Sequence, residues 1–418
     1  MWQANYAYWL VGPKLLYFCT FLLQFSFYAF RSNVFKNYFG FSTERSGWYF
    51  CLMAACSFVG ISFWSRLVDK TGKPKQVYFA LILLSSLFFL PLAFKPNAYV
   101  QSVLLGAYSF CIFGMNPILS QCVLQMLDAS GLQGNKEIYG RQVLFGSFAY
   151  VAVNLVLGPS IDVYGEGAVF YIFSLSALAL LAVVYFCFPS DGTAGRAVQA
   201  AQSDGKDAQQ QSMSERVSLL FRGNSRFAIF LGVIFLTGCA RSVMSAFLTL
   251  YYRELHLSNT QSTFNLISGV VLETACFYWG PRMARVSAHW MLILAQVAMV
   301  IRSWAYVFIP QNTHTFSLLL GIELLKGLAF GLTHLAGVRV ACESAPVGLE
   351  TTAQGFYEGF YSQLPNAFAM PLAGWTLHRF GFEWLFLVTA YGISASCFFV
   401  TITFWNSGKL QRMLVKEE

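Results

Sequence analysis

Charged residues are scarce in this chain of 418 residues. Asp, Glu, Lys and Arg make up 11% of it, against about 25% in an ordinary soluble domain. So little charge cannot solvate the surface of so long a chain, which excludes a soluble enzyme, a disordered chain and a nucleic-acid binder of the usual kind. Because hydrophobic residues reach 56%, the composition predicts a helical integral membrane protein that is embedded in a lipid bilayer.

Histidine clusters and paired cysteines are missing as well. The five histidines are scattered without an H-x-x-x-H spacing, and none of the ten cysteines forms a C-x-x-C. A membrane enzyme needs a nucleophile–base pair or a set of metal ligands. We therefore predict no catalytic residue, no metal site and no cofactor. Met1–Gly12 has neither a basic start nor a small-residue cleavage site, so we expect the first span itself to direct insertion.

Long apolar runs dominate what remains. Each is close to the roughly 20 residues that a membrane-spanning helix needs, and none alternates as a β-barrel strand would. The pattern predicts an all-α membrane protein with 12 transmembrane helices: a six-helix bundle at 1–189, a polar cytoplasmic linker at 190–224 and a second six-helix bundle at 225–418. The runs are Leu15–Phe39, Ser46–Ser65, Gln76–Phe94, Ala98–Gln121, Gln142–Ile161, Ala168–Phe188, Arg226–Leu250, Thr263–Gly280, Ala288–Ile309, Phe316–Val338, Gln354–Leu377 and Trp384–Phe404.

The distribution of Lys and Arg supports this count of spans. With a cytoplasmic N-terminus, five of the 27 basic residues fall on the outer side and four fall inside spans, which leaves 18 on the cytoplasmic side. Such a bias is typical of cytoplasmic loops, and one missed span would invert the later loops. We therefore expect both termini to be cytoplasmic. The five outer residues are Lys36, Arg45, Lys95, Arg253 and Arg379.

We assign four cations and two acids to the interior of the spans. Each charge at mid-membrane costs roughly 2.5–3.5 kcal/mol on insertion scales, so these groups must form ion pairs, line a hydrated cavity, or do both. One interpretation is that they are buried ion pairs that only fix helix packing. The other is that they bind a solute or a proton. The six are Arg31, Arg241, Glu273, Arg302, Glu323 and Lys326.

Polar residues recur at helical spacing in several spans, and this favours the second interpretation. Gln24, Tyr28 and Arg31 share one face of the first span, and Glu323 and Lys326 are neighbours at i, i+3 in the tenth. Such stripes, meeting in a bundle, indicate a hydrated central cavity. The predicted solute-binding residues are Gln24, Tyr28, Arg31, Gln121, Gln125, Arg241, Glu358 and Asn366.

Two pairs of glycines predict close contacts between helices. Gly327-x-x-x-Gly331 and Gly355-x-x-x-Gly359 each place two small residues on one face, where a neighbouring backbone can approach.

The plan of two six-helix halves resembles the major facilitator superfamily. The loop after the second span supports this likeness, because it resembles the family pattern G-x-L-a-D-r-x-G-r-k. Ser65 replaces the leading Gly, and the matching residues are Leu67, Asp69, Lys70, Gly72 and Lys73. The resemblance implies the major facilitator fold, transport by alternating access and a monomer as the default state. It also implies that Asp69, Gly72 and Lys73 form a conformational latch on the cytoplasmic side.

Within the superfamily the chain is most similar to the lactose permease-like group of sugar, nucleoside and phenylpropionate permeases. Tyr139-Gly140-Arg141 resembles the F/Y-G-R of that group, although Val143 stands where the sugar permease has a galactoside-binding Arg. Glu273 and Arg302 stand where that permease has a sugar-contacting acid and an Arg linked to proton handling. The tenth span departs from its pattern.

These observations lead to a hypothesis of proton-coupled symport. Glu273 and Glu323 are the candidate proton carriers and Arg302 and Lys326 their partners, while Arg31 and Arg241 are candidates for the solute. The solute is a sugar, a nucleoside or an aromatic carboxylate, and the surplus of intramembrane cations favours a carboxylate or phosphate on it. Two alternatives stay open: a uniporter or exchanger, and a transporter-like receptor that does not transport. We expect the plasma membrane, specifically a bacterial inner membrane, as the location.

Overall fold

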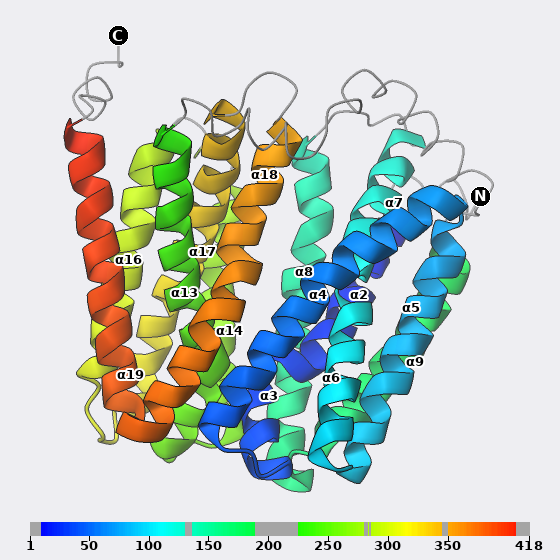
Figure 1. Cartoon of the computed structure of the whole chain (residues 1–418), viewed down its shortest axis with the longest axis horizontal. Coiled ribbons are helices and arrows are strands. Elements are labelled where there is room, and N and C mark those ends of the chain that lie inside the picture. Colours follow the sequence, from blue (N-terminus) through cyan, green and yellow to red (C-terminus); the bar gives the residue numbers. More distant parts are fainter. Residues whose placement is uncertain are drawn as a thin grey trace. The chain divides into compact units, whose positions relative to one another are not determined.

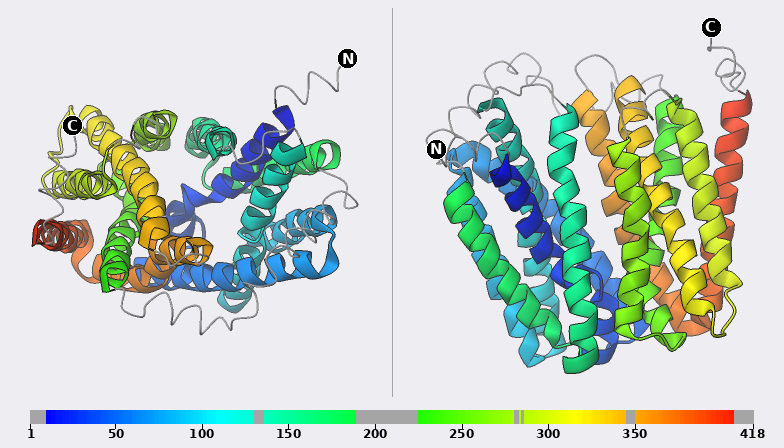
Figure 2. Two further views of the ribbon diagram at one scale, coloured as in Figure 1. Left: turned by 90° about the horizontal axis from the view of Figure 1, so that it is seen from above. Right: turned by 180° about the vertical axis from the view of Figure 1, so that it is seen from behind.

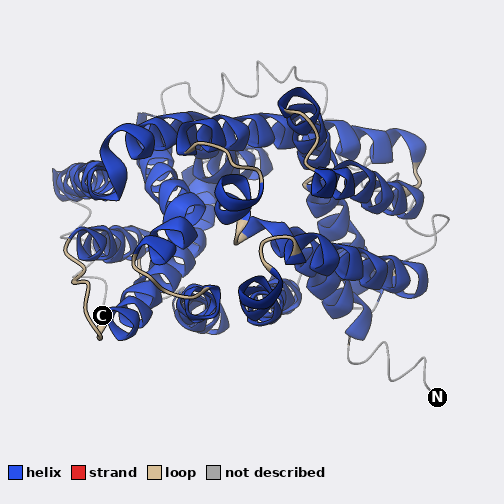
Figure 3. Ribbon diagram, turned by 90° about the horizontal axis from the view of Figure 1, so that it is seen from below, coloured by secondary structure: helices blue, strands red, loops and turns tan. Residues whose placement is uncertain are grey.

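The computed structural model describes residues 10–129, 136–188, 225–279, 283, 286–344 and 350–406. Every regular element in those ranges is a helix (Figure 3). The predicted linker at 190–224 and both chain ends lie outside the described residues. The chain divides into two compact units, one formed by Met1–Ser42 with Tyr49–Gln209 and the other by Thr43–Trp48 with Gln210–Glu418.

The first unit is built around a cluster of aromatic side chains from four helices. The rings of Phe89 and Phe173 have centroids 4.3 Å apart, and Phe27 and Tyr108 pack against Phe89 at 5.0 and 4.8 Å. The elements are α2 (Val11–Tyr28), α3 (Arg31–Asn33), the π-helix η1 (Val34–Tyr38), α4 (Thr43–Thr71), α5 (Pro74–Phe89), η2 (Leu90–Phe94), α6 (Ala98–Ile112), α7 (Met115–Ala129), α8 (Lys136–Tyr164) and α9 (Ala168–Cys187), labelled in part in Figure 1.

The second unit has its own hydrophobic core, in which Phe227, Leu292, Leu332 and Tyr357 are buried. Its helices, coloured green to red, run alongside one another in both views of Figure 2. The elements are α13 (Ser225–Glu254), α14 (Asn259–Tyr278), α16 (Ala288–Val307), α17 (Thr315–Ser344), α18 (Glu350–Glu358), the π-helix η3 (Gly359–Gln363) and α19 (Leu364–Asn406).

Nine helical stretches of the described residues are long and apolar enough to cross a membrane. The last of them, Ala353–Ile402, contains the predicted run Gln354–Leu377 and most of the run Trp384–Phe404. They are separated at Gly381, where φ is 82°, a value that glycine adopts readily and that other residues adopt at a cost. The structure therefore has the helical membrane architecture that the sequence predicts, and a total of 12 spans is compatible with it.

The contact between α14 and α17 is close enough to require glycine. A Cβ atom at Gly327 would overlap the carbonyl oxygen of Gly269, and one at Gly331 would lie 2.6 Å from the Cβ of Cys276. The close contact predicted for this glycine pair is confirmed. The prediction for the second pair is wrong, because a Cβ at Gly355 or Gly359 would meet no described atom within 4 Å.

The predicted latch residues lie where α4 turns into α5. Gly72 has a φ of 63° and donates its N–H to the carbonyl of Val68 over 2.8 Å, which ends α4. Asp69 and Lys73 are exposed on either side of it. Within the described ranges, no ion pair of Asp69 is found. The backbone thus explains the glycine, and the latch role of all three residues stays a prediction.

Candidate functional site

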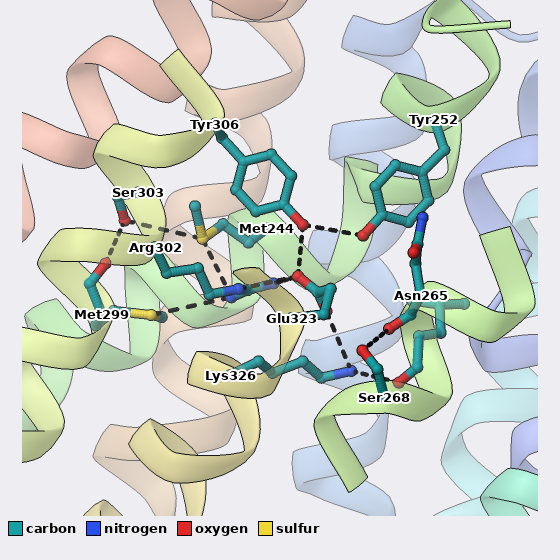
Figure 4. Close-up of polar contacts among 11 residues, drawn as sticks. Met244, Tyr252, Asn265, Ser268, Met299, Arg302, Ser303, Tyr306, Glu323 and Lys326 are labelled. Carbon is teal, nitrogen blue, oxygen red and sulfur yellow. Dashed lines mark hydrogen bonds and ion pairs between the residues drawn. The ribbon is translucent and has the colours of Figure 1, made fainter. Parts of the chain in front are cut away.

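A fully buried carboxylate, that of Glu323 on α17, is the centre of a polar network in the second unit (Figure 4). Arg302 on α16 donates to its Oε1 atom twice, from Nε over 3.0 Å and from NH2 over 2.7 Å. Tyr306, one turn further along α16, donates its hydroxyl to the same oxygen over 2.5 Å. One carboxylate oxygen therefore accepts three hydrogen bonds.

A second tyrosine extends this network to α13. The hydroxyls of Tyr252 and Tyr306 are 2.9 Å apart. Because a phenol has one proton and Tyr306 gives it to Glu323, Tyr252 is the donor in this bond. Both side chains are at most 1% exposed. The chain of hydroxyls therefore points its hydrogen bonds toward Glu323.

The other carboxylate oxygen, Oε2, makes weaker contacts. Oε2 of Glu323 lies 3.8 Å from Nζ of Lys326, which is 24% exposed and also donates to the carbonyl of Leu266 over 3.3 Å. Among the described residues, no hydrogen-bond partner reaches this buried oxygen. The two oxygens of this carboxylate therefore have very different contacts. Of the two cations beside Glu323, Lys326 is partly exposed and Arg302 is buried.

The groups around Arg302 are soft and apolar. Its NH1 atom lies 3.3 Å from the sulfur of Met244 and 3.9 Å from that of Met299, and thioether sulfur is a weak acceptor. Glu323 is therefore the strong partner of Arg302. Asn265, whose side chain points toward Tyr252 in Figure 4, is fully buried, and neither of its amide atoms has a described hydrogen-bond partner.

The structure brings together three of the four predicted proton-coupling residues, Arg302, Glu323 and Lys326. Glu273 is half-buried on α14, on the face that approaches α17: its backbone nitrogen would be 2.8 Å from a Cβ at Gly327. Tyr306 and Tyr252 were not predicted from the sequence. The spacing of Tyr306 four residues after Arg302 was the signal that could have found the first of them.

The predicted solute-binding residues of the second unit lie near Tyr361. Arg241 on α13 stacks on the Tyr361 ring at 4.6 Å and donates to its carbonyl over 3.4 Å. Glu358 is 51% exposed and lies 3.8 Å from His334. Asn366 on α19 donates to the carbonyl of Ser362 in η3 over 2.7 Å.

Those of the first unit lie on α2, α3 and α7. Gln24 is buried and donates to Asn116 over 2.7 Å and to the carbonyl of Ile112 over 3.2 Å. Arg31 is also buried, with its guanidinium 3.9 Å from the ring centre of Tyr28. Gln125 is half-buried and Gln121 is exposed. In the described part of the chain, no group of three His, Cys, Asp or Glu residues is placed to hold a metal ion.

Comparison with known proteins identifies the family of this helical chain. The model of the MFS_1 like family matches residues 10–388. The chain belongs to the MFS_1 like family. No curated protein matches it at a significant level. Membership in this family and the apolar helices make it an integral membrane protein with the major facilitator fold, related to transporters.

Solved structures similar to this MFS_1-like protein are also transporters. The nucleoside transporter NupG superposes with a TM-score of 0.78 at 15% identity, over 94% of this chain and 98% of that one. A POT family transporter in complex with a thioalcohol-conjugated peptide has a TM-score of 0.70 at 11% identity, covering 95% and 96%. Another, in complex with 5-aminolevulinic acid, has a TM-score of 0.69 at 10% identity over the same shares. At these identities the likeness shows the fold alone.

Proposed function

We propose that this MFS_1-like protein is a proton-coupled symporter, which moves a small polar organic solute by alternating access, and that Glu323 carries the coupled proton. The observation that carries the proposal is the asymmetry of this buried carboxylate. One oxygen accepts from Arg302 and Tyr306, whereas the other has only Lys326 at 3.8 Å. A proton can therefore be added at Oε2 without breaking any of the hydrogen bonds to Oε1.

The charge of this site explains how proton binding is coupled to solute binding. With Glu323 ionised, the carboxylate and the cations of Arg302 and Lys326 sum to one positive charge. Protonation of Glu323 adds a second positive charge in a buried place, which is unfavourable. Movement of Lys326 into solvent, or arrival of a negatively charged solute, removes that excess. Proton and solute then raise each other's affinity, which is the reciprocity that symport requires.

The other predicted site residues are assigned supporting roles in transport. Glu273, on the same α14–α17 contact, is proposed as a second proton carrier. The polar residues near Arg31 and Arg241 are proposed to bind the solute, for which a sugar, a nucleoside and an aromatic carboxylate are the candidates. Asp69, Gly72 and Lys73 are proposed to latch the cytoplasmic side. We further propose a monomer in the plasma membrane, with both termini in the cytoplasm.

Two lines of comparison support a transported organic solute. The family match covers most of the chain, and similar folds are those of a nucleoside transporter and of a POT family transporter in complex with a peptide. These folds belong to proteins that bind different solutes, so the fold alone does not select one.

Uptake into liposomes tests the proposal. The purified protein is reconstituted and offered labelled sugars, nucleosides and aromatic carboxylates with and without an imposed proton gradient, beside Glu323→Gln and Glu273→Gln. For wild type, we expect the gradient to drive accumulation of one solute class. For Glu323→Gln, we expect accumulation to fall to the level of protein-free liposomes, while exchange of internal for external solute continues.

Exchange is the control, because it needs solute binding and alternating access without net proton movement. Gradient-driven accumulation by Glu323→Gln at the wild-type level would contradict the proposal. Wild-type uptake that does not depend on the proton gradient would make the protein a uniporter or exchanger. Glu323 and Arg302 would then serve only to hold α16 on α17.

A further inference from the structure

Arg31, which lies outside the Glu323 network, is a buried cation in the first unit. It is 6% exposed, and it is the only buried charged side chain among the described residues of that unit. A single charge at this depth is costly unless an opposite charge accompanies it. The buried charge of Arg31 therefore needs neighbouring groups or a ligand that stabilise it.

The guanidinium of Arg31 lies over two aromatic rings. The Cζ atom lies 3.9 Å from the ring centre of Tyr28 and 4.6 Å from that of Phe50. Cation–π contact stabilises the charge through the face of the planar group. A ring offers no oxygen or nitrogen acceptor to the N–H groups.

The N–H groups along one edge of Arg31 have no acceptor in the described residues. Both Nε and NH2 are buried, and neither has a hydrogen-bond partner. In Arg302 the same two nitrogens donate to the carboxylate of Glu323, at 3.0 and 2.7 Å. Two N–H groups on one edge of a guanidinium match the spacing of a carboxylate. Arg31 thus presents to a ligand the same edge that Arg302 uses toward Glu323.

The backbone at Arg31 is interrupted, which is a second sign of a binding site. The helix α2 ends at Tyr28, Phe30 has φ of −106° and ψ of 14°, and α3 begins at Arg31 and continues into a π-helix. Irregular backbone at membrane depth occurs where a segment is buried in protein or lines a hydrated cavity. Breaks of this kind mark solute sites in transporters.

We infer that the solute carries a carboxylate, which the Nε–NH2 edge of Arg31 binds, while Tyr28 and Phe50 hold the guanidinium in place. One buried cation in this unit balances one negative charge, so an organic monoanion fits better than a dianionic phosphate. This inference rests on the proposed function as a solute transporter and selects one of its candidate solute classes. Sugars and nucleosides bring no such charge.

Equilibrium binding at fixed pH, with no gradient, tests the inference in the purified full-length protein. The probes are carboxylates, each paired with its neutral amide: benzoate with benzamide, and hexanoate with hexanamide. Phenyl phosphate tests whether a phosphate binds in place of the carboxylate. We expect at least one carboxylate to bind wild type, and its amide to bind about 10- to 100-fold more weakly, the loss expected for a hydrogen bond to a charged group. Phenyl phosphate should bind more weakly than benzoate.

Three variants assign the binding to Arg31. Arg31→Gln should lose the preference for carboxylate over amide, and Arg31→Lys should keep part of it, because an ammonium keeps the charge without the two-pronged edge. The matched control is Lys95→Gln, which removes an exposed cation stacked at 4.2 Å on Tyr38. It should bind as wild type does. If Arg31→Gln does not fold, a reduced preference of Arg31→Lys for carboxylate over amide assigns the binding to Arg31.

Three outcomes would overturn the inference: no carboxylate in the panel binds wild type, the phosphate binds better than the carboxylates, or both Arg31 variants keep the full preference. Glu323→Gln separates this result from the proposed coupling, because binding at fixed pH does not need a proton gradient. Retained carboxylate binding by Glu323→Gln, together with unchanged gradient-driven uptake, would refute the coupling and leave the Arg31 assignment standing.

Discussion

Replacement of Arg302 by methionine is expected to destabilise the protein by about 3–5 kcal/mol, because it leaves the carboxylate of Glu323 buried without its charged partner. Arg302 is 2% exposed and Glu323 is 0% exposed, so water cannot take over the lost contacts. Lys326→Met should cost much less, about 1 kcal/mol, since this lysine is partly exposed and 3.8 Å from the carboxylate. Thermal unfolding in detergent measures both.

The double variant Arg302→Met with Glu323→Met separates stability from transport. Replacing both members of a buried ion pair with apolar side chains is often neutral or stabilising, so we expect the melting temperature to return to near the wild-type value. Gradient-driven uptake should stay absent, because no acid remains to carry the proton. A stable Arg302→Met single variant would show that the pair is not a buried ion pair of the kind described.

The second large effect is expected at Gly327. Overpacking of a core costs roughly 1–3 kcal/mol, and Gly327→Ala should exceed this range because the atom met is the backbone oxygen of Gly269, which cannot move aside as a side chain does. Gly355→Ala is the matched control: its Cβ meets no described atom within 4 Å, and a helical Gly→Ala change is favourable by up to about 1 kcal/mol. Folded yield and melting temperature report the difference.

This contact also holds the candidate site in place. A Cβ at Gly269 would lie 2.8 Å from the carbonyl oxygen of Glu323 and 3.3 Å from Cδ of Lys326. Gly327→Ala is therefore expected to shift the carboxylate away from Arg302 and to abolish gradient-driven uptake as well. A variant as stable and active as Gly355→Ala would contradict the close packing of α14 on α17.

The sequence predicts the helices well and their interruptions poorly. Bilayer thickness fixes how long an apolar segment must be, so runs such as Ala168–Phe188 mark helices such as α9 (Ala168–Cys187) directly. The break before Arg31 and the π-helix of Gly359–Gln363 leave no such mark. Gly355 shows the same limit, because a glycine pair on one face favours a close contact but does not say whether a neighbour lies there.

For the candidate site, helical spacing accounts for what could be predicted. Glu323 and Lys326 are i, i+3 on one helix, so their pairing follows from sequence alone. The choice of Glu323 over Glu273 as the partner of Arg302 depends on which helices pack together, and that is a tertiary property. Tyr252 and Tyr306 lie in apolar stretches, where a tyrosine is hard to tell from a core aromatic, and only their contacts reveal them.

Proton entry driven by the solute tests the central claim, that Glu323 carries the coupled proton, most directly. Liposomes containing the protein enclose a pH-sensitive dye, and the transported solute is added outside with no imposed gradient. We expect solute entry to acidify the lumen in wild type. We expect no acidification with Glu323→Gln, although this variant still exchanges internal for external solute. Equal acidification by Glu323→Gln and wild type would contradict it.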